Sequence, residues 1–292
     1  MTGVVLIWGI NVSVMKLAVG EVSPLVFNAL RFPLGALLLG ALLFRFEQRP
    51  WPARGEWREM IFLGILAHPI YQLCFLTGLA LTTASHTAIL VATTPVFVAI
   101  ADHFVLRERL GRREWIGIGL SLGGVLLLTA ARSPGAASGS VLGDLLVLAS
   151  GVLWTTYTIR SRPLLKERTP VWVTAWALLI GTPFVVVMGI PGLLSLEWGS
   201  LTAVTWGGGV YAGLLALGTA YLFWAIGIRA LGASRAAIFS NLIPIVALAV
   251  AAVWLHETLP LLAWVGAGVA LAGVWVTTAS HFVRPAPGSP EA

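Results

Sequence analysis

Long apolar segments alternate with short polar connections along almost the whole chain. Each apolar segment is close to the roughly 20 residues that an α-helix needs to cross the hydrocarbon core of a bilayer. The segments lie at residues 3–19, 25–44, 59–80, 84–106, 113–131, 141–159, 170–190, 203–228, 233–255 and 260–281. The pattern predicts an all-α integral membrane protein with ten transmembrane helices.

The stretch from Ala84 to Val125 recurs at Ala233 to Val274, at a constant offset of 149 residues. This offset aligns Ala84/Ala233, Ser85/Ser234, Pro95/Pro244, Glu108/Glu257, Trp115/Trp264, Gly117/Gly266, Gly124/Gly273 and, upstream, Gly64/Gly213, while Trp8/Trp154 and Pro24/Pro170 are 146 residues apart. An internal repeat of this kind indicates duplication of one unit. We therefore divide the chain into repeat 1 (1–131), a linker (132–140), repeat 2 (141–283) and a disordered cytoplasmic tail (284–292).

Lysine and arginine are concentrated in every second connection between the predicted helices. Of the 18 such residues, 15 follow the second, fourth, sixth, eighth and tenth helices. Because positively charged loops stay in the cytoplasm, we expect a multi-pass protein of the plasma (inner) membrane with both termini cytoplasmic. Five helices per repeat then give the halves opposite orientations, which predicts two inverted five-helix repeats around a central cavity.

The composition agrees with a membrane protein. Hydrophobic residues make up 58% of the chain and charged residues 10%, and the mean hydropathy is +0.91. So little polar surface is too little to cover a water-soluble domain. The net charge of +6 serves membrane orientation in this interpretation, so the partners expected are lipid and a small solute, with no nucleic acid, in a monomer or homodimer.

Several chemistries lack the residues they need. The five histidines fall on different predicted helices or helix ends without motif-spaced partners, so no metal is expected. No glycine-rich phosphate loop occurs, so no ATP is used by this chain and no cofactor is expected. The single Cys74 cannot form an intramolecular disulfide.

Polar and aromatic residues at mid-membrane depth are the candidate binding residues, because an unpaired polar group there costs several kcal/mol. They are Trp8, Asn11, Arg31, His68, Tyr71, Gln72, Trp154, Tyr157, Tyr221, Trp224 and Asn241. Nearly all are neutral, which suits a solute with paired charges of its own, such as an amino acid. For the amides the alternative is hydrogen bonding between helices, and for His68 it is simple packing.

Arg31 carries the one fixed charge inside this candidate set. It lies roughly 9 Å inside the second predicted helix, at ~1.5 Å per residue, so its side chain could still reach the membrane surface. The alternative is a binding role, because no carboxylate in the neighbouring apolar segments is placed to neutralise it. A guanidinium without a fixed partner can dock a substrate carboxylate.

Two further features concern helix geometry. Pro95 and Pro244 occupy equivalent positions within predicted helices, where each removes a backbone hydrogen bond, so they form either hinges or static kinks. Gly119-x-x-x-Gly123 and Gly268-x-x-x-Ala272 are faces of small residues, which we expect to pack inside the bundle.

The order of these elements is similar to the drug/metabolite transporter superfamily, specifically its ten-helix EamA-type exporters. The resemblance rests on Trp8-Gly9, Lys16, Pro24, Arg31-Phe32 and the Pro95, Glu108, Trp115-x-Gly-x-Gly cassette. It covers nearly the whole chain. The second half departs from it, since Ala177-Leu178 or its neighbours stand where Arg31-Phe32 would repeat. The resemblance implies transport of amino acids or other small metabolites along a central pathway.

The predicted function is therefore export of small metabolites, amino acids first, by alternating access between the repeats. No Asp or Glu falls at mid-depth in the predicted helices, so a facilitator is favoured over a proton-coupled drug or metabolite antiporter. The alternative from another class is a membrane-embedded lipid-modifying enzyme. That chemistry needs clustered carboxylates or histidines, which the sequence lacks, so no enzyme activity is expected.

Overall fold

The computed structural model describes residues 1–105, 110–130, 140–231, 236, 239, 242–257 and 259–283, and every regular element in these ranges is a helix. The α-helices are α1 (Thr2–Ala18), α2 (Pro24–Phe46), α3 (Trp57–Ile65), α4 (Tyr71–Leu81), α5 (Ala84–Val91), α6 (Thr94–Val105), α7 (Arg112–Ala130), α8 (Val141–Glu167), α9 (Pro170–Leu194), α10 (Ala203–Val210), α11 (Ala220–Leu231), α13 (Ile243–Trp254) and α14 (Leu261–Val283). A short 3₁₀ turn, η2, spans Trp198–Ser200. The all-helical class predicted from the sequence is confirmed for the described residues.

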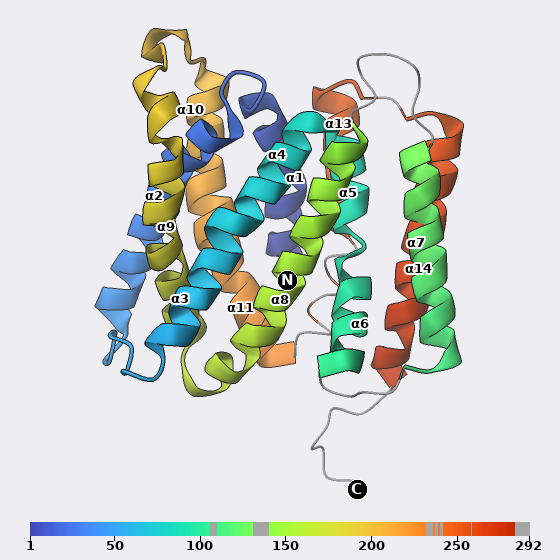
Figure 1. Cartoon of the computed structure of the whole chain (residues 1–292), viewed down its shortest axis with the longest axis horizontal. Helices are drawn as coiled ribbons and strands as arrows, with labels where there is room; N and C mark the ends of the chain where they lie inside the picture. The colour runs from blue at the N-terminus through green and yellow to red at the C-terminus, as the bar shows by residue number, and fades with distance from the viewer. Residues whose placement is uncertain are drawn as a thin grey trace, which may run out of the picture.

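The helices form one elongated bundle with its long axes roughly parallel (Figure 1). Within the described part of the chain, seven helical segments are long and apolar enough to cross a membrane: Pro24–Phe46, Trp57–Leu81, Ala84–Ala101, Arg112–Ala130, Val141–Glu167, Pro170–Leu194 and Ala203–Leu231. Large apolar side chains also cover the outside of the bundle, with exposed fractions of 71% for Leu37, 70% for Phe104 and 70% for Leu126. Apolar surface on this scale requires lipid rather than water around it.

Two long helices are continuous in direction but contain wide π-helical turns. Such turns are found at Leu66–Ile70 (η1), between α3 and α4, and at Tyr211–Thr219 (η3), between α10 and α11. The first contains Pro69, whose missing N–H removes one backbone hydrogen bond of the helix. A π-helical turn leaves backbone carbonyls available to accept other hydrogen bonds. The Trp8 indole N–H donates to one of them, that of Ala216 in η3.

The segment predicted as one helix over 84–106 is broken. α5 ends at Val91 and α6 begins at Thr94, so Pro95 lies in the first turn of a new helix instead of in the middle of a long one. The Val91 carbonyl is not left free by the proline, because the Thr94 hydroxyl donates to it at 2.6 Å. Pro244 likewise occupies the first turn of α13. Proline is well tolerated there, because a first-turn N–H has no intrahelical partner.

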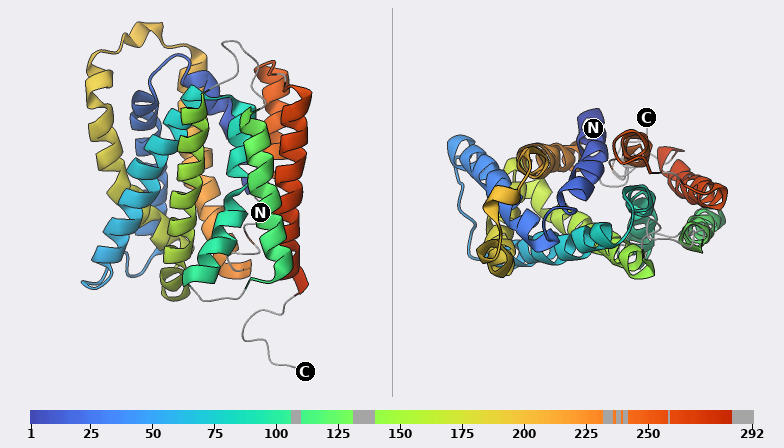
Figure 2. Two further views of the ribbon diagram at one scale, coloured as in Figure 1. Left: turned by 45° about the vertical axis from the view of Figure 1, so that its right-hand side comes forward. Right: turned by 90° about the horizontal axis from the view of Figure 1, so that it is seen from above.

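α7 and α14 pack side by side at one edge of the bundle (Figures 1 and 2). The contact is so close that a Cβ on Gly117 would overlap Thr277, and a Cβ on Gly124 would overlap the backbone of Ala270. Gly117 faces the Gly273 carbonyl and Gly124 faces the Gly266 carbonyl. The helices are therefore antiparallel, and each glycine of α7 faces the repeat equivalent of the other.

The prediction about the Gly119 and Gly268 faces is wrong. A Cβ added to Gly119, Gly123 or Gly268 would meet nothing within 4 Å. The packing face instead uses glycines seven residues apart, which return to the same side of a helix after two turns. When a helix contains small residues at both spacings, its sequence does not show which of the two faces packs against a neighbouring helix.

Helices of the two halves also interleave at the opposite edge of the bundle. The Cβ position on Gly35 of α2 lies 3.0 Å from the Gly213 carbonyl oxygen in η3, and that on Gly181 of α9 lies 2.7 Å from the Gly64 carbonyl oxygen in α3. Gly35 and Gly181 are 146 residues apart, and Gly64 and Gly213 are 149 apart. The two crossings are thus made by equivalent residues, and each joins one half of the chain to the other.

Charged side chains lock the α4–α5 turn, at the top of the bundle in Figure 1. Lys16 at the end of α1 donates to the carbonyls of Leu79 and Ala80, at 2.9 and 3.2 Å, and to that of Thr82. A cation there binds the unsatisfied carbonyls at a helix C-terminus. Glu257, between α13 and α14, accepts from the backbone N–H groups of Ala84 and Ser85 at 2.9 and 2.8 Å, and so caps α5.

At the lower end, the α8–α9 connection is tied to the start of α3. Arg168 donates two hydrogen bonds to the Glu56 carboxylate, at 2.7 and 2.8 Å. These bonds lower the pKa of Glu56 below its usual value, because they favour the ionised form.

We expect Gly124→Val to destabilise the protein while the same change at its neighbour Gly123 does not. The added side chain at Gly124 must displace the Ala270 backbone, which costs about 1–3 kcal/mol or more as overpacking. The thermal midpoint of the purified protein in detergent measures the effect. Equal midpoints for Gly124→Val and Gly123→Val would contradict the packing described for α7 and α14.

Candidate functional site

A cavity lies inside the bundle, where the broken and π-helical segments meet. It measures about 90 Å³ in the space open to the centres of water-sized molecules, enough for several waters or one small solute. It is lined by Trp8, Asn11, Val12, Met15, Arg31, Tyr71, Gln72, Phe75, Ala88, Val91, Thr94, Val98, Ser150, Gly151, Trp154, Thr158, Ala216, Leu217, Tyr221, Trp224 and Ile243. The lining therefore comes from both halves of the chain.

Arg31 is buried in the wall of this cavity and does not reach the membrane surface. Its exposed fraction is 1%. Nε and Nη2 both donate to Oδ1 of Asn28, at 3.0 and 2.8 Å, and Nη2 donates to Oε1 of Gln72 at 2.7 Å. This burial excludes the alternative in which the Arg31 side chain reaches the membrane surface.

The partners that hold Arg31 are all neutral. Its guanidinium lies 5.4 Å from the ring centre of Phe27 and 5.5 Å from that of Phe32, and within the described residues it forms no ion pair with a carboxylate. No described residue accepts a hydrogen bond from Nη1. A fixed positive charge with two available N–H donors thus faces the cavity.

Several pairs of repeat-equivalent residues line the cavity. Gln72 and Tyr221 are 149 residues apart, and Gln72 Nε2 donates to the Tyr221 hydroxyl at 3.4 Å. Trp8 and Trp154 are 146 residues apart, and their rings meet edge to face with centres 5.8 Å apart. Phe75 and Trp224, again 149 apart, both line the wall. Equivalent residues thus meet at the cavity, which lies between the two halves of the chain.

Aromatic side chains make up much of the wall. Trp154 stacks on Tyr221 with ring centres 5.2 Å apart, and Trp8 lies 5.4 Å from Trp224. The ring of Tyr71 lies 5.4 Å from that of Trp154 and stacks on Phe75 at 5.6 Å. The indole N–H of Trp8 donates to the Ala216 carbonyl in the π-helical segment η3, at 3.1 Å, which fixes its ring. These rings offer apolar faces and a few polar edges to a bound solute.

Eight of the eleven predicted binding residues line the cavity: Trp8, Asn11, Arg31, Tyr71, Gln72, Trp154, Tyr221 and Trp224. Their assembly from five helices was not visible in the sequence. Two of the other three, His68 and Tyr157, do not line it.

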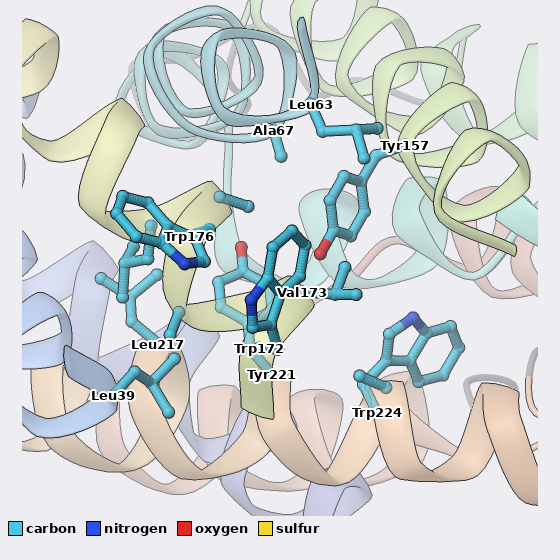
Figure 3. Close-up of a cluster of buried hydrophobic side chains, with 14 of the residues drawn as sticks. Leu39, Leu63, Ala67, Tyr157, Trp172, Val173, Trp176, Leu217, Tyr221 and Trp224 are labelled. Atoms are coloured by element: carbon cyan, nitrogen blue, oxygen red, sulfur yellow. The ribbon is translucent and has the colours of Figure 1, made fainter. Parts of the chain in front are cut away.

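His68 and Tyr157 lie behind the wall, and Asn241 lies outside the described residues. His68 packs edge to face on Phe32, with ring centres 5.6 Å apart, and against Gly181. Figure 3 shows Tyr157 within an apolar cluster that includes Trp172 and Val173.

Asn28, which holds Arg31, and Phe75, which lines the cavity, are two of the residues that sequence reasoning missed. Asn28 is 2% exposed and lies three residues before Arg31, a spacing at which helix side chains meet. That spacing to a buried arginine was the available signal. Phe75 is marked by its repeat equivalence to Trp224.

The described residues contain no group of three or more His, Cys, Asp or Glu side chains able to hold a metal ion. Apart from the Arg31 guanidinium, the described side chains that line the cavity are neutral, and six of them are aromatic. Such a cavity can enclose and orient a small solute. An anionic group of that solute would lie toward Arg31.

Comparison with known proteins identifies the group to which the chain belongs. The family model described as the EamA-like transporter family matches residues 1–130 and 141–279. Similar proteins include the "Uncharacterized transporter YoaV" of Bacillus subtilis, 26% identical over 94% of both chains, and an "Uncharacterized transporter" of Archaeoglobus fulgidus, 26% identical over 94% of this chain and 95% of the relative.

A further relative, the "Uncharacterized protein PA1977" of Pseudomonas aeruginosa, is 30% identical over 80% of this chain and 76% of its own. A solved crystal structure shares the fold, with a TM-score of 0.68 at 20% identity and 97% coverage of both chains. The chain is a multi-pass membrane protein of the EamA-like transporter family.

Proposed function

We propose that this protein exports amino acids, and that one molecule binds in the central cavity with its carboxylate on Arg31. The observation that carries the proposal is a fully buried guanidinium whose described partners are all neutral. A buried charge without a countercharge costs several kcal/mol. A substrate carboxylate would supply the countercharge, so the empty site is prepared for an anionic group.

The shape and chemistry of the wall favour an apolar or aromatic side chain on that amino acid. Six aromatic rings line the cavity, those of Trp8, Tyr71, Phe75, Trp154, Tyr221 and Trp224. Burial of an apolar group against these rings contributes roughly 25 cal/mol per Å² removed from water. A highly polar side chain would lose its hydration there without equivalent hydrogen bonds.

Transport is proposed to proceed by alternating access between two inverted five-helix repeats. Support comes from the equivalent contacts, in which Gly117 faces Gly273 and Gly124 faces Gly266 on antiparallel helices. Further support is the contact of Gln72 with its own equivalent, Tyr221. A binding site near the axis between inverted repeats can face either side when one half rocks against the other.

Pro95 and Pro244 remain proposed hinges, now in the first turns of α6 and α13 instead of inside long helices. A break followed by a first-turn proline allows the two helical pieces to change their angle without losing many backbone hydrogen bonds. The break before α6 borders the cavity, since Val91 and Thr94 both line it.

The proposed orientation places both termini in the cytoplasm and the α4–α5 turn on the outer side of the inner membrane. The basis is the alternation of arginine-rich connections described above. Family membership and the relatives named as transporters favour transport over lipid-modifying chemistry. Export of abundant internal amino acids would then follow their concentration gradient.

Arg31→Gln should reduce exchange of amino acids in proteoliposomes by about 100-fold, because truncating a buried charge contact costs 2–5 kcal/mol. Arg31→Lys should retain part of the activity, since one ammonium cannot bind Asn28, Gln72 and substrate with the geometry of the planar fork. Arg45→Gln, an exposed arginine on the same helix, is the control. Exchange by Arg31→Gln at the wild-type rate would reject the binding role.

A substrate panel belongs in the same assay. Amino acids, nucleobases and cationic drugs are compared as competitors of exchange, and the folded state of each variant is checked by its thermal midpoint. No exchange of any of these solutes by well-folded wild-type protein would reject the proposed function.

Asn28→Asp tests whether the neutrality of the Arg31 partners matters. An Asp at this position would form an internal ion pair with Arg31 and compete with a substrate carboxylate, so we expect affinity for amino acids to fall about ten-fold or more. Folding should be preserved, because the new carboxylate accepts the same two hydrogen bonds. Unchanged affinity in a stable variant would show that Arg31 is a structural group.

Energy coupling is tested by collapsing an imposed pH gradient across the proteoliposome membrane. A facilitator should exchange amino acids at an unchanged rate. Within the described residues the cavity wall contains no carboxylate, the usual proton-coupling group. A large loss of rate would favour the proton-coupled antiporter, with His68 the residue to substitute next.

A further inference from the structure

Asn11 presents a hydrogen-bond acceptor that nothing in the described protein satisfies. The residue lines the cavity and has an exposed fraction of 6%. Its Nδ2 donates to the Met15 sulfur at 3.4 Å, while Oδ1 is buried and has no hydrogen-bond partner among the described residues. A buried carbonyl oxygen left in this state costs about 1–3 kcal/mol.

The other polar groups of the wall have a different character. The Thr94 hydroxyl donates to the Val91 carbonyl at the end of α5, and the Ser150 hydroxyl donates to a carbonyl of its own helix, both at 2.6 Å. Trp224 Nε1 has no partner but can only donate. Thr158 Oγ1 is also unpartnered, yet a hydroxyl can rotate to donate or accept.

Among the lining side chains just described, Asn11 carries the unpartnered atom that can only accept a hydrogen bond. Arg31 meanwhile has donors that require an acceptor. The cavity thus carries opposite hydrogen-bonding needs at two residues that belong to different helices, α1 and α2.

We propose that Asn11 is the residue that recognises the ammonium group of the bound amino acid. This inference rests on the proposed function of the cavity. An ammonium group has three N–H donors, and Oδ1 would accept one of them while Arg31 holds the carboxylate. The neutral amide recognises the amine by hydrogen bonding and leaves the charge of Arg31 uncompensated, as carboxylate docking requires.

Asn11 therefore sets selectivity for α-amino acids over carboxylic acids of the same shape. A carboxylic acid without the amine would enter with its carboxylate on Arg31 and leave Oδ1 unpaired. Sites built to hydrogen-bond a polar group reject analogues that lack it far more strongly than apolar pockets reject a change of size.

The experiment measures equilibrium binding of L-phenylalanine and of 3-phenylpropionate, its analogue without the amine, to the detergent-solubilised full-length protein by calorimetry. The aromatic wall motivates this pair, and binding avoids the leakage of the acid through lipid. The variants are wild type, Asn11→Leu and Asn11→Asp. Ser13→Ala is the matched control, because the Ser13 hydroxyl on the same helix is buried and unpartnered but Ser13 does not line the cavity.

We expect wild type to bind phenylalanine about ten-fold or more tightly than phenylpropionate, as a hydrogen bond to a charged group implies. Asn11→Leu should remove most of this ratio by weakening phenylalanine alone, and Ser13→Ala should retain it. Asn11→Asp should raise the ratio, because a carboxylate attracts the amine and repels the acid.

Equal weakening of both ligands by Asn11→Leu, or an unchanged ratio in Asn11→Asp, would overturn the role of Asn11 while leaving the proposed function intact. If Asn11→Leu does not fold, the Asn11→Asp ratio decides alone. Failure of folded wild-type protein to bind either ligand would overturn the inference together with the amino-acid proposal.

Discussion

A single guanidinium inside an apolar bundle constrains much of this structure. Arg31 is too costly to leave bare, so the fold surrounds it with amide oxygens from Asn28 and Gln72 and with the faces of Phe27 and Phe32. These groups solvate the charge without cancelling it. A carboxylate in their place would give a more conventional buried ion pair but would leave the cavity with no electrostatic preference.

The cavity exists because the two halves of the chain meet there through equivalent residues. Large rings at Trp8, Trp154 and Tyr221 prevent close approach of the helices around the cavity, while glycines at the edges allow backbones to touch. Gly35 and Gly213 on one side, and Gly124 and Gly266 on the other, show this contrast. Small residues outside and large residues at the centre therefore create an internal space without any loop to enclose it.

Much of the fold could be predicted because hydrophobic length dictates membrane helices. The break at Val91–Thr94 could not, since a proline in an apolar segment is compatible with a kink, a hinge or a new helix start, and only the local hydrogen bonds decide. The π-helical turns could not be predicted either, because again only the local hydrogen bonds decide. The glycine face of α7 was misassigned because its helix carries two sets of small residues and the sequence does not say which side meets a partner.

The sequence identified the site residues whose chemistry is unusual in a membrane helix. Asn11, Gln72 and Arg31 are conspicuous as polar groups in apolar segments, and each lines the cavity. His68 was equally conspicuous but lies behind the wall, because depth in the membrane does not fix the direction of a side chain. Asn28 was overlooked, although its three-residue spacing from Arg31 on one helix could have identified it.

The pairing of α7 with α14 also bears on how the protein is made. α7 is an early helix of the chain and α14 is the last, so more than a hundred residues must be synthesised after α7 before its glycine face can be covered. In the bilayer, small residues gain little from lipid contact and much from close packing. The glycine face of α7 therefore stays unpacked during insertion, until α14 has been synthesised and pairs with it.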